Sequence, residues 1–292
     1  MSNHLRPCCG QNCQVLPPYS KPKWHSGGKP IGFKLCVGQF YEVAAICKAM
    51  LKSGQSPDFI TVDGGEGGTG AGPLEFVDFM GTPLDDALYV VHNMLVGYGL
   101  RSKVKIICSG QVLNAFDLIK RFAEGADMCN SARAMMLSLG CIQAYRCNSN
   151  TCPTGVATTN PALYRGLDVS IKGKRVANFH RNTLHAVAEM VGAMGLDSTN
   201  YLNASHIMRR VSPHSVQSLE QLRPSLCDGD ILHARVSDEW KRIDAQAVAG
   251  SFRDQTDVDF SRHHSLSVAS NAPAKPSFKH ASRMRPSREF MP

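Results

Sequence analysis

The chain has 292 residues, of which 43% are hydrophobic and 7% aromatic, so it can bury the core of one α/β domain or of two smaller ones. The formal net charge is +8, but residues 261–292 hold six cations and one acid. That segment is rich in Ser, Pro, Ala and His and has too little apolar surface to offset its ordering entropy, so we expect a disordered basic tail and no nucleic-acid partner.

Membrane insertion and export are not indicated. The sequence has no run of about 18 uncharged apolar residues, and its first residues lack the apolar core of a signal peptide. Cysteines such as Cys47 and Cys108 lie within apolar segments, as buried thiols do. A reducing compartment therefore fits better than a disulfide framework, and we expect a cytoplasmic protein without a membrane partner.

The predicted elements begin after a leader, residues 1–26, that is rich in proline and poorly structured. Cys8, Cys9 and Cys13 in this leader do not complete a zinc-type set of four ligands. From Ile31 onward, short apolar runs alternate with longer amphipathic segments, which is typical of βα units and a parallel sheet. The predicted strands are 31–37, 59–62, 104–108 and 127–130, and the predicted helices are 41–53, 84–98, 115–124, 132–139, 175–194, 204–211 and 239–248.

A glycine-rich segment, Asp63–Pro73, directly follows the second strand and holds six glycines in eleven residues. It lacks the Gly-Lys-Ser/Thr of a P-loop and the spacing of a dinucleotide-binding fingerprint. A mobile loop is one interpretation. A loop that approaches a flat cofactor or substrate closely explains the glycines better.

Polar residues also end the next two strands, as Ser109-Gly110-Gln111 and Asn130-Ser131-Ala132-Arg133. In a (β/α)8 barrel, the loops after the last two strands and a helix N-terminus form a phosphate site, to which Arg133 would add a charge-assisted contact. Lys34 lies within the first strand, where a charge is costly without a partner. Its ammonium either reaches solvent at the strand end or stabilises negative charge on a cofactor ring.

Three cysteines, Cys141, Cys147 and Cys152, form a C-x5-C-x4-C array within twelve residues. Soft thiolates in a short loop suit Zn²⁺ or an iron–sulfur cluster, and a proline such as Pro153 often follows the last cysteine of an iron–sulfur run. Three ligands rather than four favour a [3Fe-4S] cluster.

Taken in order, GGEGGTGAGP, SGQ, NSAR and GCIQAYRCNSNTCPTGVATTNP resemble the FMN-binding synthase domain of the glutamate synthases, and in particular the stand-alone FMN-binding glutamate synthase family. The resemblance covers about residues 27–219. It implies a (β/α)8 barrel with FMN and a [3Fe-4S] cluster, and an electron donor such as ferredoxin or a flavoprotein subunit. It also implies reductive amination of 2-oxoglutarate through 2-iminoglutarate formed with ammonia.

The same resemblance assigns roles to individual residues. Lys34 would be the catalytic cation at the N1/O2 edge of the flavin, and the three cysteines would ligate iron. The FMN phosphate would be held by Ser109, Gly110, Gln111, Ser131, Ala132 and Arg133. The flavin and substrate side would be lined by Gly67, Gly68, Thr69, Gly70 and Ala71.

The sequence also departs from the family. Lys34 is followed by Leu-Cys-Val-Gly instead of Ser-Glu, and Ile107 replaces an expected arginine. Only four βα units precede the cysteines, so we expect the C-terminal half of an FMN-type (β/α)8 TIM barrel at 27–225, with additional C-terminal helices and a mostly disordered tail at 226–292. The missing half would come from another polypeptide or a second copy, or the chain is a truncated product. A non-catalytic FMN/iron–sulfur electron-transfer subunit and another FMN-barrel dehydrogenase remain alternatives.

Overall fold

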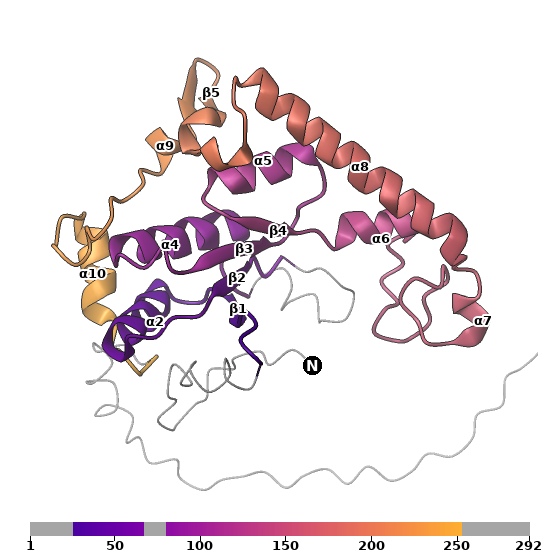
Figure 1. Ribbon diagram of the computed structural model, residues 1–292, viewed down its shortest axis with the longest axis horizontal. Coiled ribbons are helices and arrows are strands. Elements are labelled where there is room, and N and C mark those ends of the chain that lie inside the picture. The colour runs from indigo at the N-terminus through magenta and orange to yellow at the C-terminus, as the bar shows by residue number, and fades with distance from the viewer. Residues whose placement is uncertain (1–25, 67–79, 253–292) are drawn as a thin grey trace, which may run out of the picture. The chain divides into compact units, whose positions relative to one another are not determined.

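The structure is a computed structural model that describes residues 26–66 and 80–252 (Figure 1). The predicted leader up to residue 25, most of the glycine-rich loop and the tail beyond residue 252 lie outside the described residues. No described helix combines the length and apolarity needed to cross a bilayer.

A parallel four-stranded sheet forms the centre of the fold. Its strands are β1 (Gly32–Cys36), β2 (Phe59–Asp63), β3 (Lys105–Ser109) and β4 (Met128–Asn130), in the spatial order β1-β2-β3-β4. Each strand pairs with the next strand in the chain, always on the same side. Because β-helix-β crossovers between parallel strands are right-handed, the connecting helices lie on one face of the sheet. This is the arrangement of a (β/α)8 barrel and differs from a doubly wound sheet, whose strand order reverses. The α/β fold with part of a barrel-type sheet is confirmed, and the described strands do not close a barrel.

The helices follow the strands as predicted, because each has local start or stop signals. Asn114 and Asp117 form a capping box at the start of one helix, and Gly54 ends another in the left-handed conformation. The bounds are α2 (Phe40–Ser53), α4 (Leu84–Gly97), α5 (Ala115–Ala123) and α6 (Arg133–Leu139). Strand side chains such as Leu35, Val62 and Cys108 join α2 and α4 in the main hydrophobic cluster.

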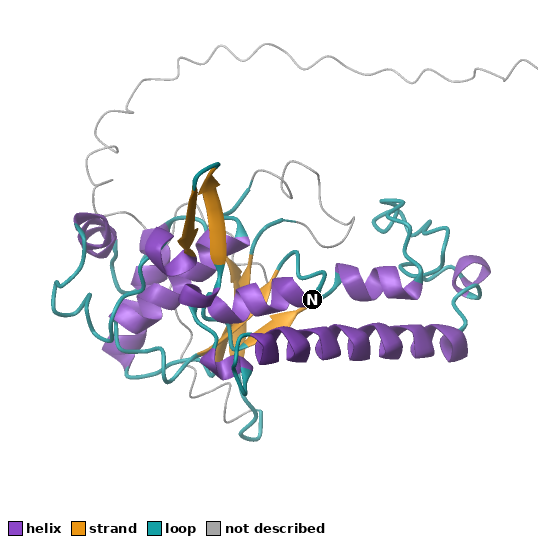
Figure 2. Cartoon of the chain, turned by 90° about the horizontal axis from the view of Figure 1, so that it is seen from above, coloured by secondary structure: helices purple, strands orange, loops and turns teal. Residues whose placement is uncertain are grey.

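A second hydrophobic cluster lies between α5 and α8 (Val169–Ala193), the 25-residue helix that runs past α5 and α6 in Figures 1 and 2. Val187 and Val191 of α8 pack there against Ile119 of α5. The helix begins six residues before the predicted start at 175, where Asp168 caps it by accepting from two backbone amides. Its first turns are exposed, with Val169 at 80%, so apolar periodicity could not reveal them.

The predicted helix at 204–211 is wrong. After the short 3₁₀ turns η1 (Thr199–Tyr201) and η2 (Ala204–His206), the chain forms an antiparallel hairpin of β5 (Met208–Ser212) and β6 (Ser215–Ser218). Ile207 and Val211 fit helical spacing, but two apolar positions four residues apart also fit an alternating strand. The remaining short helices are α7 (Pro161–Tyr164) and α9 (Leu219–Leu222).

The predicted start of the disordered tail at residue 226 is too early. Residues 226–252 include α10 (Asp238–Gln246), whose Trp240 is buried in the main cluster. Lys48 of α2 donates to the carbonyl oxygens of Asp244 at 2.6 Å and Ala247 at 3.2 Å. The hydroxyl of Tyr98, which directly follows α4, donates to the Asp244 carboxylate. The apolar residues here are few, but they lie where α10 contacts the core.

Candidate functional site

The face of the sheet turned away from α2 and α4 carries polar side chains at the carboxyl ends of the strands. Cys36, Asp63, Ser109 and Asn130 are neighbours in register across the four strands, and Lys34 lies one row behind them. None of these side chains belongs to a hydrophobic cluster. Functional groups of (β/α)8 barrels gather at this end of the strands, so this face is the candidate site.

Lys34 has a partner in Asp63. Its Nζ lies 2.5 Å from Asp63 Oδ2, and the two side chains are 52% and 30% exposed. The other carboxylate oxygen of Asp63 accepts from the Gly65 amide at 3.0 Å. The carboxylate therefore connects the lysine to the start of the glycine-rich loop. Asp63 was not predicted as a site residue, although an acid that ends a buried apolar strand is a usable signal.

The base of the glycine-rich loop is held tightly against its neighbours. The Gly64 amide donates to the Ser109 carbonyl at 3.0 Å, and a Cβ at Gly64 would lie 2.7 Å from Leu84 Cβ. Glu66 Oε1 accepts from the Leu84 amide at 3.4 Å, while its buried Oε2 has no hydrogen-bond partner among the described residues. A Cβ on Gly110 would be 3.5 Å from this oxygen. The next residues, Gly67–Ala71, lie outside the described part.

The two predicted phosphate loops lie side by side. Ser131 Oγ donates to the Val112 carbonyl at 2.8 Å, which joins the loop after β4 to the loop after β3. Gly110 and Gln111 take positive φ values of 151° and 46°. Arg133 begins α6 and makes no ion pair with the described residues. Because α6 has only seven residues, the guanidinium and the loop amides are the main groups that could hold an anion.

The cysteine loop connects α6 to α7, and Cys152 is its buried thiol. The Thr154 hydroxyl, 3.4 Å from Sγ, and nearby backbone amides lower the pKa of Cys152 to about 7. Cys141 Sγ accepts from the Gln143 amide at 3.4 Å. Such N–H and O–H donors stabilise thiolate ligands.

The cysteines do not form a converged metal site. In the described ranges, no three Cys, His, Asp or Glu side chains come close enough together to hold a metal ion. The donor set still fits a thiophilic cluster, because three thiols share one loop and one of them is held in a thiolate-stabilising setting. The middle of the loop is joined to its C-terminal end by Asn150, whose Oδ1 accepts from the Thr159 amide at 2.7 Å.

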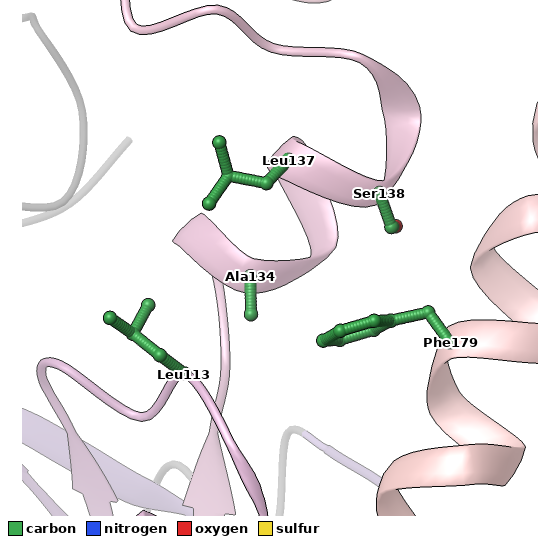
Figure 3. A pocket seen from close by; sticks show the side chains of 5 residues that line it. All are labelled: Leu113, Ala134, Leu137, Ser138 and Phe179. Carbon is green, nitrogen blue, oxygen red and sulfur yellow. The ribbon is translucent and has the colours of Figure 1, made fainter.

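A cavity of about 300 Å³ lies beside the phosphate loops (Figure 3). Leu113, Ala134, Leu137 and Phe179 line it with apolar side chains, and Ser138 is its polar residue. The Ser138 hydroxyl is already bonded to the Met135 carbonyl at 2.7 Å. This cavity therefore offers no catalytic group, and the sheet face turned away from α2 and α4 remains the candidate site.

The family profile described as "Conserved region in glutamate synthase" matches residues 22–197. The chain belongs to the glutamate synthase family. The matched region includes the Lys34–Asp63 pair, both phosphate loops and all three cysteines of the loop.

Curated members of the glutamate synthase family are similar to the chain over this region. The glutamate synthase large subunit-like protein YerD of Bacillus subtilis is 42% identical over 196 residues, which cover 67% of this chain and 37% of the relative. The archaeal-type glutamate synthase [NADPH] of Thermotoga maritima is 34% identical over 65% of this chain and 37% of its own length. The ferredoxin-dependent glutamate synthase of Antithamnion sp. is 34% identical over 50% of this chain and 9% of the relative.

Among solved structures, flavocytochrome b2 with pyruvate bound covers 76% of this chain and 44% of that chain, with a TM-score of 0.36 and 14% identity. The structure of DHODH from Eimeria tenella in complex with ferulenol covers 61% of this chain and 39% of that chain, with a TM-score of 0.33 and 16% identity. At these TM-scores the likeness carries no further argument. Membership of the glutamate synthase family therefore rests on sequence, and the chain spans about a third of the length of its first curated relatives.

Proposed function

We propose that the chain supplies the FMN-binding region of a glutamate-synthase-type oxidoreductase, in which 2-iminoglutarate formed from 2-oxoglutarate and ammonia is reduced to glutamate. The observation that carries the proposal is the joint position of the Lys34–Asp63 pair and the two phosphate loops at the carboxyl ends of adjacent strands. The names of the family's curated members support the reaction class.

The residues present fit FMN. The sheet face turned away from α2 and α4 offers a half-exposed ammonium at Lys34, and the paired loops offer backbone amides and the Arg133 guanidinium for a phosphate. When bound, FMN supplies hydride transfer. Lys34 would stabilise negative charge on the flavin ring, and Asp63 would orient Lys34 through their ion pair. Ser131 contributes by holding the phosphate loops together, since its hydroxyl is committed to the Val112 carbonyl.

We further propose that Cys141, Cys147 and Cys152 ligate a [3Fe-4S] cluster, which would supply one-electron transfer. Three soft donors in one loop and the lowered pKa of Cys152 support this assignment. We infer an electron donor such as a ferredoxin or a flavoprotein subunit. The name of one relative, a ferredoxin-dependent glutamate synthase, supports the first of these.

The cations on the candidate sheet face favour a second candidate function, that of an electron-transfer subunit. Lys34 and Lys105 are the cations that the described strands place on this face, and Lys105 is paired with Asp127 at 3.1 Å. The two carboxylates of 2-oxoglutarate would need further cations, which we assign to a polypeptide that supplies the remaining strands. Without that polypeptide, the chain would act as an FMN/iron–sulfur electron-transfer subunit.

FMN titration tests the main proposal. We expect the chain to quench FMN fluorescence on binding, and Arg133→Met to weaken binding by about tenfold, the effect of losing one charge-assisted contact. Lys34→Met should weaken binding of reduced FMN more than oxidised FMN. Lys103→Met is the matched control, because this exposed lysine precedes β3 at the opposite end of the sheet, and it should bind as the wild type does.

The outcomes separate the candidates. A chain that binds no FMN, or an Arg133→Met variant that binds as tightly as wild type, would contradict the main proposal. FMN binding without glutamate formation from 2-oxoglutarate, ammonium and a chemical reductant would favour the electron-transfer subunit.

A further inference from the structure

Two thiols are in contact on the strands that lead into the phosphate loops. Cys108 of β3 and Cys129 of β4 are partners in the parallel register, and their Sγ atoms lie 3.3 Å apart. Cys108 is a fully buried member of the main hydrophobic cluster, and the partly buried Cys129 packs against the same cluster. The pair therefore lies on the helix-covered face of the sheet, and neither the proposed FMN site nor the proposed iron–sulfur site uses it.

The backbone places the two cysteines within reach of a disulfide bond. Neighbouring strands lie about 4.8 Å apart, and the Cα atoms of bridged cysteines are usually about 4.4 to about 6.8 Å apart. Residues in register on neighbouring strands also direct their side chains to the same face. In the described sheet, the three-residue strand β4 is an end strand that pairs with β3. It can therefore approach β3 with little disturbance to the rest of the sheet.

A buried cation acts on the pair. Arg121 of α5 is 6% exposed, and its Nη1 pairs with Glu124 at 2.9 Å and with Asp85. Its Nε has no hydrogen-bond partner among the described residues. The contact with Cys108 and burial raise the pKa of Cys129, whereas the Arg121 charge acts to lower it. The resting pair is therefore protonated, and Arg121 supplies a positive charge that stabilises the thiolate when Cys129 reacts.

We propose that Cys108 and Cys129 are a redox-sensitive thiol pair, which hydrogen peroxide converts to a disulfide that displaces the phosphate loops. The Cys129 sulfur attacks one peroxide oxygen, the O–O bond breaks, and the other oxygen leaves as water with the thiol proton. The Cys108 sulfur then attacks the sulfenic acid at Cys129. The S–S bond forms, the S–O bond breaks, and a second water leaves with the Cys108 proton. The two thiols lose two electrons, which reduce the peroxide to water.

The phosphate loops respond because each one begins directly after a cysteine. Ser109 follows Cys108, Asn130 follows Cys129, and these two residues are also partners in register. Just beyond them, the Ser131 hydroxyl donates to the Val112 carbonyl at 2.8 Å. Drawing β3 and β4 together at the cysteines shifts one loop against the other and strains this bond. The effect on FMN binding rests on the proposed function, whereas formation of the disulfide does not.

Peptide mapping of peroxide-treated protein tests the pair without flavin or turnover. The folded full chain is treated with hydrogen peroxide, then alkylated with iodoacetamide before it is unfolded and digested with trypsin. Trypsin separates the two cysteines, which fall in peptides 106–120 and 122–133 with one cysteine each. We expect these two peptides to be linked after treatment, at least about tenfold more often than before it, and to be separated by dithiothreitol.

Two variants remove the bridge, and a third is the matched control. Cys129→Ser and Cys108→Ala should each abolish the linked peptides. Cys227→Ser replaces an exposed thiol between α9 and α10 and should form the bridge as the wild type does; circular dichroism checks folding. In FMN titrations, the oxidised wild type should bind at least about fivefold more weakly than the reduced protein. Dithiothreitol should restore binding, and peroxide should leave the affinity of Cys129→Ser unchanged.

Each result decides a part of the proposal. Absence of the linked peptides, or sulfinic or sulfonic acid at Cys129 in their place, would overturn the thiol pair. A bridged protein that binds FMN as tightly as the reduced protein would overturn the effect on the phosphate loops. A chain that binds no FMN in either form would contradict the proposed function, and the linked peptides alone would then decide whether the pair forms a disulfide.

Discussion

Lowering the pH below neutrality should destabilise the fold through His92. This residue lies on α4, where Arg101 Nε donates to its Nδ1 at 3.3 Å. Gly125 packs against the His92 ring, and a Cβ at this position would lie only 2.2 Å from Nδ1. Its φ of 101° is also a conformation that favours glycine. Burial, reinforced by the Arg101 charge, lowers the pKa of His92 from 6.5 to about 4.

The size of the effect follows from the difference between the folded and unfolded pKa values. Above pH 6.5 the imidazole is neutral in both states and contributes no pH dependence. Between pH 6.5 and about 4 the unfolded chain binds a proton that the folded chain does not, so the unfolding free energy falls with decreasing pH. A difference of about 2.5 pKa units corresponds to about 3 kcal/mol in total, and to at most about 1.4 kcal/mol per pH unit.

Urea denaturation of the wild type and His92→Gln at pH 7.5, 6.5, 5.5 and 4.5 measures this contribution. Glutamine does not titrate, and other groups with shifted pKa values, such as Asp85 and Asp127, are common to both proteins. The wild type should therefore lose about 2.5 kcal/mol more than the variant between pH 7.5 and pH 4.5, because the last part of the effect appears only below pH 4.5. Parallel pH profiles for the two proteins would show that His92 is not held neutral by its surroundings.

Three other variants test separate parts of the structure. Cys147→Ser should abolish iron incorporation measured after anaerobic purification, and a full iron complement in this variant would remove Cys147 from the ligand set. Ser131→Ala should lower the unfolding free energy by about 1 kcal/mol and weaken FMN binding, because it removes the bond between the phosphate loops; unchanged values for both would refute this role. Trp240→Ala should cost about 3 kcal/mol in urea denaturation, whereas a change below about 0.5 kcal/mol would mean that α10 is not part of the core.

The sequence predicted the sheet and the helices around it because each element repeats a simple pattern. Short β-branched runs such as Phe59–Val62 and amphipathic segments such as α5 are visible from their periodicity alone. The hairpin β5–β6 and the first turns of α8 were missed because they are exposed and leave little apolar periodicity. The docking of α10 depends on a few contacts with residues that are distant in sequence, including Lys48 and Tyr98.

The individual residues of the candidate site could be predicted from the sequence, whereas the hydrogen bonds and ion pairs between them could not. Lys34 and the phosphate loops were found because a mid-strand charge and polar strand ends are local features. The pairing of Lys34 with Asp63 and of Ser131 with Val112 depends on strand register, which a single sequence does not reveal.

The most direct test of the proposed cofactors is to measure acid-extractable flavin, iron and inorganic sulfide in the full chain purified under anaerobic conditions. We expect FMN together with iron and sulfide in the ratio of a [3Fe-4S] cluster, and an optical spectrum with both flavin and iron–sulfur bands. A folded chain that contains neither flavin nor iron, and takes up neither on reconstitution, would contradict the proposal that the Lys34 face and the cysteine loop are cofactor sites.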